Sequence, residues 1–299
     1  MGLSISSFMP AVDRALQRMS AACDLHSCRN KQIVRSIPGG RQGIHVGQRW
    51  YCSVDCFVQA ARAPLFALSS RQVVEMPRTP RLSLGLALLS KKFITAEQLR
   101  STADQSNRRT ESLDAALIRL GFVTEKQLAA ARSAQWGYPV LAQDHVGHLI
   151  QVDFPRTILA DCSAVPLHYS QAAKRIVLGF VYRVEHQLLE SIEQVTGCRV
   201  EPCFITNSDL LEQGEKVDGL PDYSEILVDN PGTPETMART TGRMAVEVGA
   251  REASFTQCIN HVWVRLAGKR GIVDVIFRST GAIAESIDKP EVEPQIAFA

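Results

Sequence analysis

The sequence LGLALLSKKFITAEQL, residues 84–99, is repeated 29 residues later as LDAALIRLGFVTEKQL, residues 113–128. Leucine, phenylalanine and glutamine recur at equivalent positions of the two copies. In each copy a threonine, Thr95 or Thr124, precedes a helical run with acidic residues in its first turn, which is the chemistry of a helix N-cap. Two helical hairpins of one design, packed against each other, are the economical explanation of such a repeat.

The segment after the repeat has a different character. AVPLHYS, RIVLGFV and RVEPCFI are rich in β-forming residues, and EHQLLESIEQVTG has helical spacing with a glycine stop. This pattern predicts a small α+β domain. Further on, TMARTTGRMAVEVGA predicts a helix, and HVWVRLAG and GIVDVIFR predict a β-hairpin that turns at Lys269 and Arg270.

Four of the eight cysteines cluster near the N-terminus: Cys23, Cys28, Cys52 and Cys56. Their spacing is C-x4-C and C-x3-C, with 23 residues between the pairs. The opening residues do not read as a secretory signal, so metal ligation is favoured over disulfides. Two short cysteine pairs meet the tetrahedral preference of zinc and predict one structural Zn2+. His26 in place of one of the first pair, or four free thiols, are the alternatives.

The residues around the second cysteine pair support a folded metal site. GIHVGQRWY alternates as a β-hairpin does, and SVDCFVQAARA reads as the start of a helix. A helix N-terminus there favours deprotonation of the nearby thiols. Loss of the metal is therefore expected to unfold roughly the first sixty residues and to leave the helical domain folded.

Composition sets the broad class. The 299 residues are 45% hydrophobic and 21% charged, which is ordinary for a globular protein of two or three domains. Lysine and arginine number 33 against 31 aspartate and glutamate, so the charge balance does not indicate nucleic acid. No apolar run is long enough to insert into a membrane as a helix.

The predicted organisation is α+β and multi-domain. Pro64, Pro77 and Pro80 mark a first linker, because proline resists regular structure. The predicted parts are an N-terminal helix and small four-cysteine zinc knuckle (1–62), a linker (63–80), a domain over 81–213 with a helical repeat (81–138) and an α+β half (139–213), a second linker (214–234), a C-terminal helix and β-hairpin (235–278), and a disordered tail (279–299).

From residue 82 to about 213, the sequence resembles the N-terminal domain of type II secretion and type IV pilus assembly ATPases. KKFITAEQL, LIRLGFVTEKQLAAARSAQWGYPVL, TGCRVEPCFIT and NSDLLEQ carry the resemblance, in the order that this domain has. GAREASFTQCINHVWVRLAGKRG resembles the start of the next domain of these ATPases, although Ala253, Ser254 and Thr256 stand at its acidic and histidine positions. RWYCSVDCF resembles the FCS-like treble-clef zinc knuckles, which are mostly interaction modules.

Some members of the ATPase family bind cyclic di-GMP through two tandem motifs, R-L-G-x-x-L-x-x-x-G followed after a short spacer by L-x-x-x-L-x-x-Q. The positions that match are Leu84, Gly85, Leu88 and Leu99 in the first motif, and Leu113, Leu117, Gly121, Leu128 and Gln135 in the second. The positions that depart are Ser83, Lys92, Ala103 and Ser106 in the first, and Ser112, Asp114 and Arg132 in the second. Both motif arginines are replaced by serine, and Asp114 adds negative charge near an anionic ligand. The departures therefore predict no binding at micromolar ligand, with the leucines serving as core.

No G-x-x-x-x-G-K-[ST] occurs, so ATP binding is not predicted, and the sequence predicts no enzyme. The resemblance implies a non-enzymatic adaptor or regulator in the bacterial cytoplasm. Its partner would be a protein of a secretion or pilus assembly machine, which could hold it at the inner membrane. One alternative is a cyclic di-GMP sensor. The other is a zinc-knuckle nucleic-acid-binding regulator that uses the nearby basic residues Arg29, Lys31, Arg35, Arg41 and Arg49.

Overall fold

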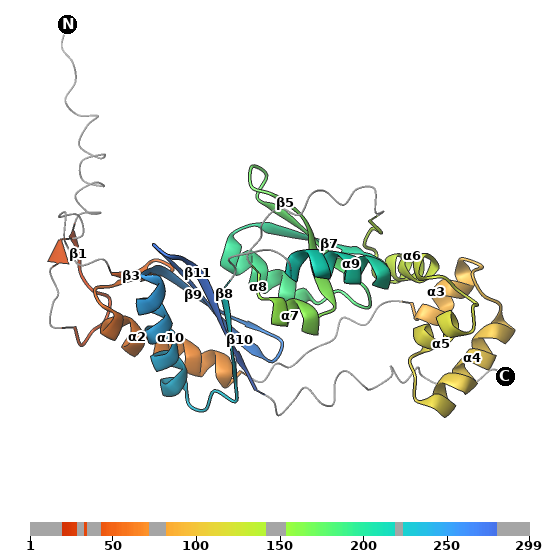
Figure 1. Cartoon of the computed structure of the whole chain (residues 1–299), viewed down its shortest axis with the longest axis horizontal. Helices are drawn as coiled ribbons and strands as arrows, with labels where there is room; N and C mark the ends of the chain where they lie inside the picture. The colour runs from red at the N-terminus through yellow and green to blue at the C-terminus, as the bar shows by residue number, and fades with distance from the viewer. Residues whose placement is uncertain are drawn as a thin grey trace, which may run out of the picture. The chain divides into compact units, whose positions relative to one another are not determined.

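The computed structural model describes residues 20–28, 33–34, 43–71, 82–141, 154–218 and 224–279 (Figure 1). These residues form two compact units. Unit 1 consists of the described residues up to 71 with 224–257 and 261–279, and unit 2 consists of 82–218 with 258–260. The predicted α+β, multi-domain fold class is confirmed. None of the helices in the described ranges combines the length and the apolarity that crossing a bilayer requires.

Unit 1 is built on a six-stranded sheet. Across the sheet the strands are β4 (Arg49–Tyr51), β3 (Ile44–Val46), β9 (Ala250–Cys258), β10 (His261–Gly268), β11 (Gly271–Arg278) and β8 (Ser224–Asp229). β3 and β4 form the expected hairpin, and β10 and β11 form the second one, with Gly268 opposite Gly271. β3 runs parallel to β9, and β8 runs parallel to β11. A separate two-stranded pair joins β1 (Ser20–Ala21) to β2 (Ile33–Val34).

Two helices, α2 (Val54–Ser69) and α10 (Pro234–Val248), pack against each other and against the sheet (Figure 1). Alternate residues of the strands face them, because side chains on a strand point to opposite faces in turn. The buried residues that meet there come from both ends of the chain: Phe57 and Leu65 from α2, Met237 and Ala245 from α10, Ala253 and Phe255 from β9, Val262 and Val264 from β10, and Val275 and Phe277 from β11.

This architecture differs from the predicted one in four places. The zinc knuckle and the C-terminal helix and hairpin, predicted as separate modules, lie in one unit and share one sheet. The predicted first linker is helical as far as Ser69, because burial of Leu65 holds the last turns of α2 in place despite Pro64. The predicted second linker contains the end of α9 (Asn207–Asp218) and all of β8, and β9 was not predicted at all.

The first half of unit 2 contains the repeat. Its helices are α3 (Leu84–Ser90), α4 (Ala96–Arg109), α5 (Leu113–Arg119) and α6 (Glu125–Trp136). α3 packs on α6 and α4 packs on α5. The two copies of the repeat also share their N-terminal capping hydrogen bonds. Thr95 forms a capping box with Gln98 at the start of α4, and Thr124 forms the same box with Gln127 at the start of α6.

The second half of unit 2 is a three-stranded sheet with helices. The strands are β5 (Ala164–Ser170), β6 (Arg175–Phe180) and β7 (Arg199–Phe204), and the helices are α7 (Arg156–Asp161), α8 (His186–Thr196) and α9. β5 and β6 are antiparallel, and β7 adds parallel to β6. α8 ends at Gly197, whose φ of 67° gives the left-handed C-cap that the glycine stop predicted.

Candidate metal centre

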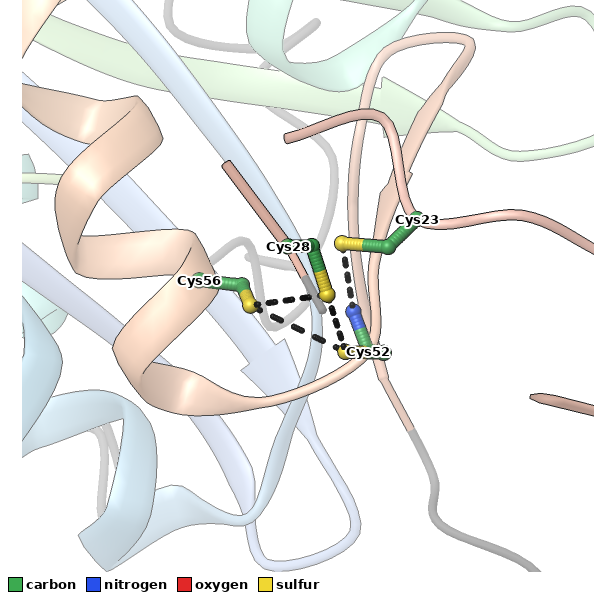
Figure 2. Close-up of side chains that lie close together, drawn as sticks. All are labelled: Cys23, Cys28, Cys52 and Cys56. Atoms are coloured by element: carbon green, nitrogen blue, oxygen red, sulfur yellow. Dashed lines mark hydrogen bonds between the residues drawn. The ribbon is translucent and has the colours of Figure 1, made fainter. Parts of the chain in front are cut away.

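The four clustered cysteines converge on one point of unit 1 (Figure 2). Cys23 and Cys28 lie on the turn that follows β1, Cys52 follows β4, and Cys56 lies in the first turn of α2. Because the hairpin of β3 and β4 leads directly into α2, it brings the second pair to the same place as the first. The structure thus brings together all four cysteines that the sequence nominated.

The spacing of the sulfur atoms fits a tetrahedral metal. Sγ of Cys28 is 3.6 Å from Sγ of Cys52 and 3.8 Å from Sγ of Cys56, and the Cys52 and Cys56 sulfurs are 3.7 Å apart. Four ligands at the zinc–sulfur distance of about 2.3 Å stand about 3.8 Å apart at the corners of a regular tetrahedron. A disulfide would bring two sulfurs to about 2 Å. All four sulfur atoms lie within 4.8 Å of one another.

Hydrogen bonds donated by backbone amides hold the two cysteine pairs together. The carboxylate of Asp24 accepts from the amide of Trp50 at 2.6 Å, and the amide of Asp24 donates to the carbonyl of Trp50 at 2.9 Å. The amide of Cys52 lies 3.5 Å from Sγ of Cys23, which is the geometry of an amide donating to a sulfur ligand. Ser53 is the N-cap of α2, and its hydroxyl accepts from the amide of Cys56 at 3.2 Å.

Gly43 allows the chain to pass close to β4. A Cβ atom at this position would lie 2.2 Å from the carbonyl oxygen of Tyr51 and 2.4 Å from Nε1 of Trp50. Any side chain here would push the start of the hairpin away from the strand that leads to Cys52. The packing around the metal centre therefore requires glycine at this position.

Burial of the site opposes the deprotonation of the thiols that the helix N-terminus was expected to favour. Burial raises the pKa of the Cys52 thiol far above its ordinary value, and hydrogen bonds with Cys28 and Cys56 add to the rise. Burial also raises the pKa of the Cys56 thiol. A bound metal ion reverses this, because it deprotonates a coordinating thiol. His26, the alternative ligand, is exposed and lies outside the cluster.

The residues of the cyclic di-GMP motif lie mainly in the core of unit 2. Leu88, Leu117 and Leu128 are buried, with Leu84, Leu99 and Leu113 packed against them at partial exposure. Gly85 and Gln135 are also buried. Gly121 is exposed and has a φ of 71°, which places it in the left-handed region that ends the turn after α5. At the equivalent position of the first copy, Lys92 adopts a φ of 57°.

The positions that depart from the motif have structural roles of their own. Ser83 and Ser112, which replace the two arginines, are the N-caps of α3 and α5, and their hydroxyls accept from the amides of Leu86 at 3.3 Å and Ala115 at 3.4 Å. A cap of this kind contributes about 1 kcal/mol to helix stability. Helix formation alone is therefore a sufficient reason for serine at both positions.

Asp114 and Arg132, two further departures, form an ion pair that the sequence did not reveal. Nη2 of Arg132 lies 2.8 Å from Oδ2 of Asp114, and the two side chains are only 9% and 13% exposed. Arg132 also donates to the carbonyl of Tyr182, and its guanidinium lies 5.1 Å from the centre of the Tyr182 ring. Arg132 thus neutralises the charge of Asp114 and, through Tyr182, joins the helical half of unit 2 to the α+β half.

Comparisons with known proteins place these observations in context. No family model matches the sequence. The type IV pilus assembly ATPase PilB of Thermus thermophilus is 25% identical over 130 residues, which are 43% of this chain and 15% of that ATPase. The chain therefore spans a small part of that relative's length. The predicted resemblance to these ATPases is confirmed as a similarity in sequence.

Two solved structures also show similarity, at low identity and low TM-score. The structure of MshE with cyclic di-GMP gives a TM-score of 0.39 at 18% identity, covering 46% of this chain and 99% of that chain. The N-terminal domain of XpsE gives a TM-score of 0.35 at 19% identity, covering 44% of this chain and 92% of that chain.

Proposed function

We propose that this chain is a non-enzymatic adaptor that docks, through unit 2, onto a protein component of a bacterial secretion or pilus assembly machine. The observation that carries the proposal is the 130-residue similarity to a pilus assembly ATPase, which covers 15% of that enzyme. The sequence contains no phosphate-binding loop, so docking and not ATP hydrolysis is the role we assign to the similar part. We place the protein in the cytoplasm, at the inner membrane through its partner.

We also propose that the metal of the cysteine centre is Zn2+ with a structural role. Four sulfur ligands in a tetrahedral arrangement select zinc or iron among the common metals. A site closed by four cysteines keeps no position for water or substrate, which distinguishes structural zinc from catalytic zinc. The ligands Cys23, Cys28, Cys52 and Cys56 would hold it between the hairpin and α2.

Neither alternative function gains support. For cyclic di-GMP, the serine caps and the pairing of Asp114 with Arg132 account for the departures, and the motif leucines pack in the core. For nucleic acid, four of the five basic residues, at positions 29, 31, 35 and 41, lie outside the described residues. The fifth, Arg49, is exposed on β4, which is the ordinary condition of a surface arginine.

Docking can be tested with the zinc-loaded, full-length chain immobilised for biolayer interferometry. The probes are the purified soluble domains of the type IV pilus and type II secretion assembly proteins of the same bacterium. We expect saturable binding of one of them, and we expect the purified assembly ATPase to displace it, because the ATPase carries a similar segment. Binding to none of the probes, or binding that the ATPase does not displace, would contradict the proposal.

A surface variant of unit 1 supplies the control. Phe66 on α2 is 63% exposed, so Phe66→Ser removes an apolar side chain without disturbing the core. Because docking is assigned to unit 2, the affinity of this variant should equal that of the wild type. The metal is tested separately, by elemental analysis of protein purified under reducing conditions, with one Zn2+ per chain as the expected result.

A further inference from the structure

The candidate metal centre lies beside the β3–β4 hairpin, which joins the N-terminal part of unit 1 to its C-terminal part. β3 of the knuckle hairpin pairs in parallel with β9, with His45 opposite Glu252 and Val46 opposite Ala253. The hairpin is therefore the edge of the sheet that β9, β10 and β11 continue. Between α2 and β8 the chain passes through unit 2, which contains all of the helical repeat.

Next to the cysteines, α2 supplies part of the core of the C-terminal sheet. Phe57 directly follows the ligand Cys56, is fully buried, and has its ring centre 6.2 Å from that of Phe255 on β9. One and two turns further along, Ala61 and Leu65 are buried as well. The same helix thus begins at the cysteine cluster and packs one face, through Phe57, Ala61 and Leu65, into the apolar core.

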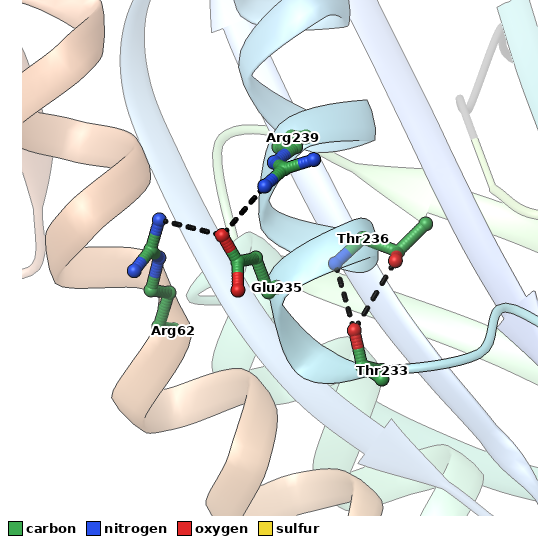
Figure 3. Close-up of polar contacts among 5 residues, drawn as sticks. All are labelled: Arg62, Thr233, Glu235, Thr236 and Arg239. Atoms are coloured by element: carbon green, nitrogen blue, oxygen red, sulfur yellow. Dashed lines mark hydrogen bonds and ion pairs between the residues drawn. The ribbon is translucent and has the colours of Figure 1, made fainter.

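α2 also fits closely against α10. A Cβ atom on Gly242 of α10 would lie 2.3 Å from Cγ2 of Val58, so the two helices approach each other closely only because this residue is glycine. At the other end of the contact, Nη2 of Arg62 lies 3.1 Å from Oε1 of Glu235, which also pairs with Arg239 at 2.7 Å (Figure 3). This ion pair is exposed, so the apolar contacts carry the stability of the interface.

We propose that occupancy of the cysteine centre controls the folding of the C-terminal sheet, residues 250–278, and not only the folding of the N-terminal knuckle. Two of the four ligands, Cys52 and Cys56, fix the end of β4 and the first turn of α2. Without a metal, four thiols replace four metal–sulfur bonds, and the start of α2 loses its anchor. When α2 detaches from the sheet, Phe255 and its neighbours lose their apolar contacts with α2 and become exposed to water.

The proposal extends the expectation that metal loss unfolds roughly the first sixty residues and leaves the helical domain folded. It also has a consequence for the proposed adaptor. Unit 2 is covalently joined to unit 1 at both of its ends, so the metal keeps the intervening chain closed as a loop. The inference rests on the proposed metal site and is independent of the docking partner.

Hydrogen exchange of the full-length chain, read by mass spectrometry, tests the coupling. One sample carries equimolar Zn2+ under reducing conditions, and the other is treated with excess EDTA. We expect EDTA to speed exchange at least about tenfold in peptides from 44–71 and equally in peptides from 250–278, with peptides from 156–218 unchanged. Unchanged exchange in 250–278, although the metal has left, would overturn the inference.

A matched pair of cysteine variants separates the metal from other effects of chelation. Cys23 and Cys198 are buried to nearly the same degree, at 8% and 7% exposure, but only Cys23 belongs to the cluster. Cys23→Ser should exchange in 250–278 like the EDTA-treated wild type, and Cys198→Ser should exchange like the zinc-loaded wild type. The reverse pattern would refute the coupling. Absence of bound metal from the wild type would refute the metal site as well, and neither result bears on docking.

Discussion

Replacing Gly242 with alanine tests the close contact between α2 and α10. The added Cβ would lie 2.3 Å from Cγ2 of Val58 and 3.7 Å from Cγ1 of Val54. Two carbon atoms are comfortable at about 3.5–4 Å, so α2 and α10 must separate by about 1 Å. Val58 cannot rotate away cheaply, because a β-branched side chain in a helix is confined to essentially one rotamer.

The expected change in the free energy of unfolding of unit 1 is a balance of two contributions. Overpacking of this kind costs about 1–3 kcal/mol. Alanine in the middle of a helix is favoured over glycine by about 0.5–1 kcal/mol, which offsets part of that cost. We therefore expect Gly242→Ala to destabilise unit 1 by about 1 kcal/mol. Val58→Ala should relieve the overlap, so the double variant should be more stable than the two single changes predict.

Native-state hydrogen exchange measures the free energy of opening for each unit separately, with peptides of β10 reporting on unit 1 and peptides of α9 on unit 2. Gly214 in α9 is the control, because a Cβ there meets no atom within 4 Å. Gly214→Ala should stabilise unit 2 by about 0.5–1 kcal/mol. If Gly242→Ala stabilises unit 1 in the same way, the reasoning about the contact between α2 and α10 is refuted.

The remaining predictions concern unit 2. Lys92→Gly should raise stability in urea by about 1 kcal/mol, because glycine adopts the left-handed φ of 57° without strain, and Gly121→Ala should lower it by a similar amount. Arg132→Met should lower the free energy of unfolding by about 3 kcal/mol in the same assay, because it leaves Asp114 largely buried without its partner. Adding Asp114→Leu should recover part of that loss. Equal destabilisation by the single and the double variant would argue against the ion pair. Calorimetric titration with cyclic di-GMP should show no saturable heat at micromolar ligand, and a submicromolar site would contradict the core role of the leucines.

Local features were predictable because short stretches of sequence determine them. The repeat, its threonine caps and the glycine stop after α8 depend on residues within a few positions of one another, and the structure has them where the sequence indicated. The convergence of the four cysteines was predictable for a related reason. Each cysteine pair lies on one turn, and the hairpin between the pairs brings the turns together, so the ligands needed no distant contact.

The sequence alone thus indicated the helices of the repeat, α8, α10, the two hairpins and the four candidate ligands. Only the tertiary structure decided which segments share a sheet. β9 has few of the residues that favour strands, and it forms because β3 and β10 pair with its two edges. Asp114 and Arg132 looked like losses from a ligand motif and are partners in the fold. Contacts such as His45 opposite Glu252 join residues far apart in the chain, and no local pattern of propensity or periodicity records such a pairing.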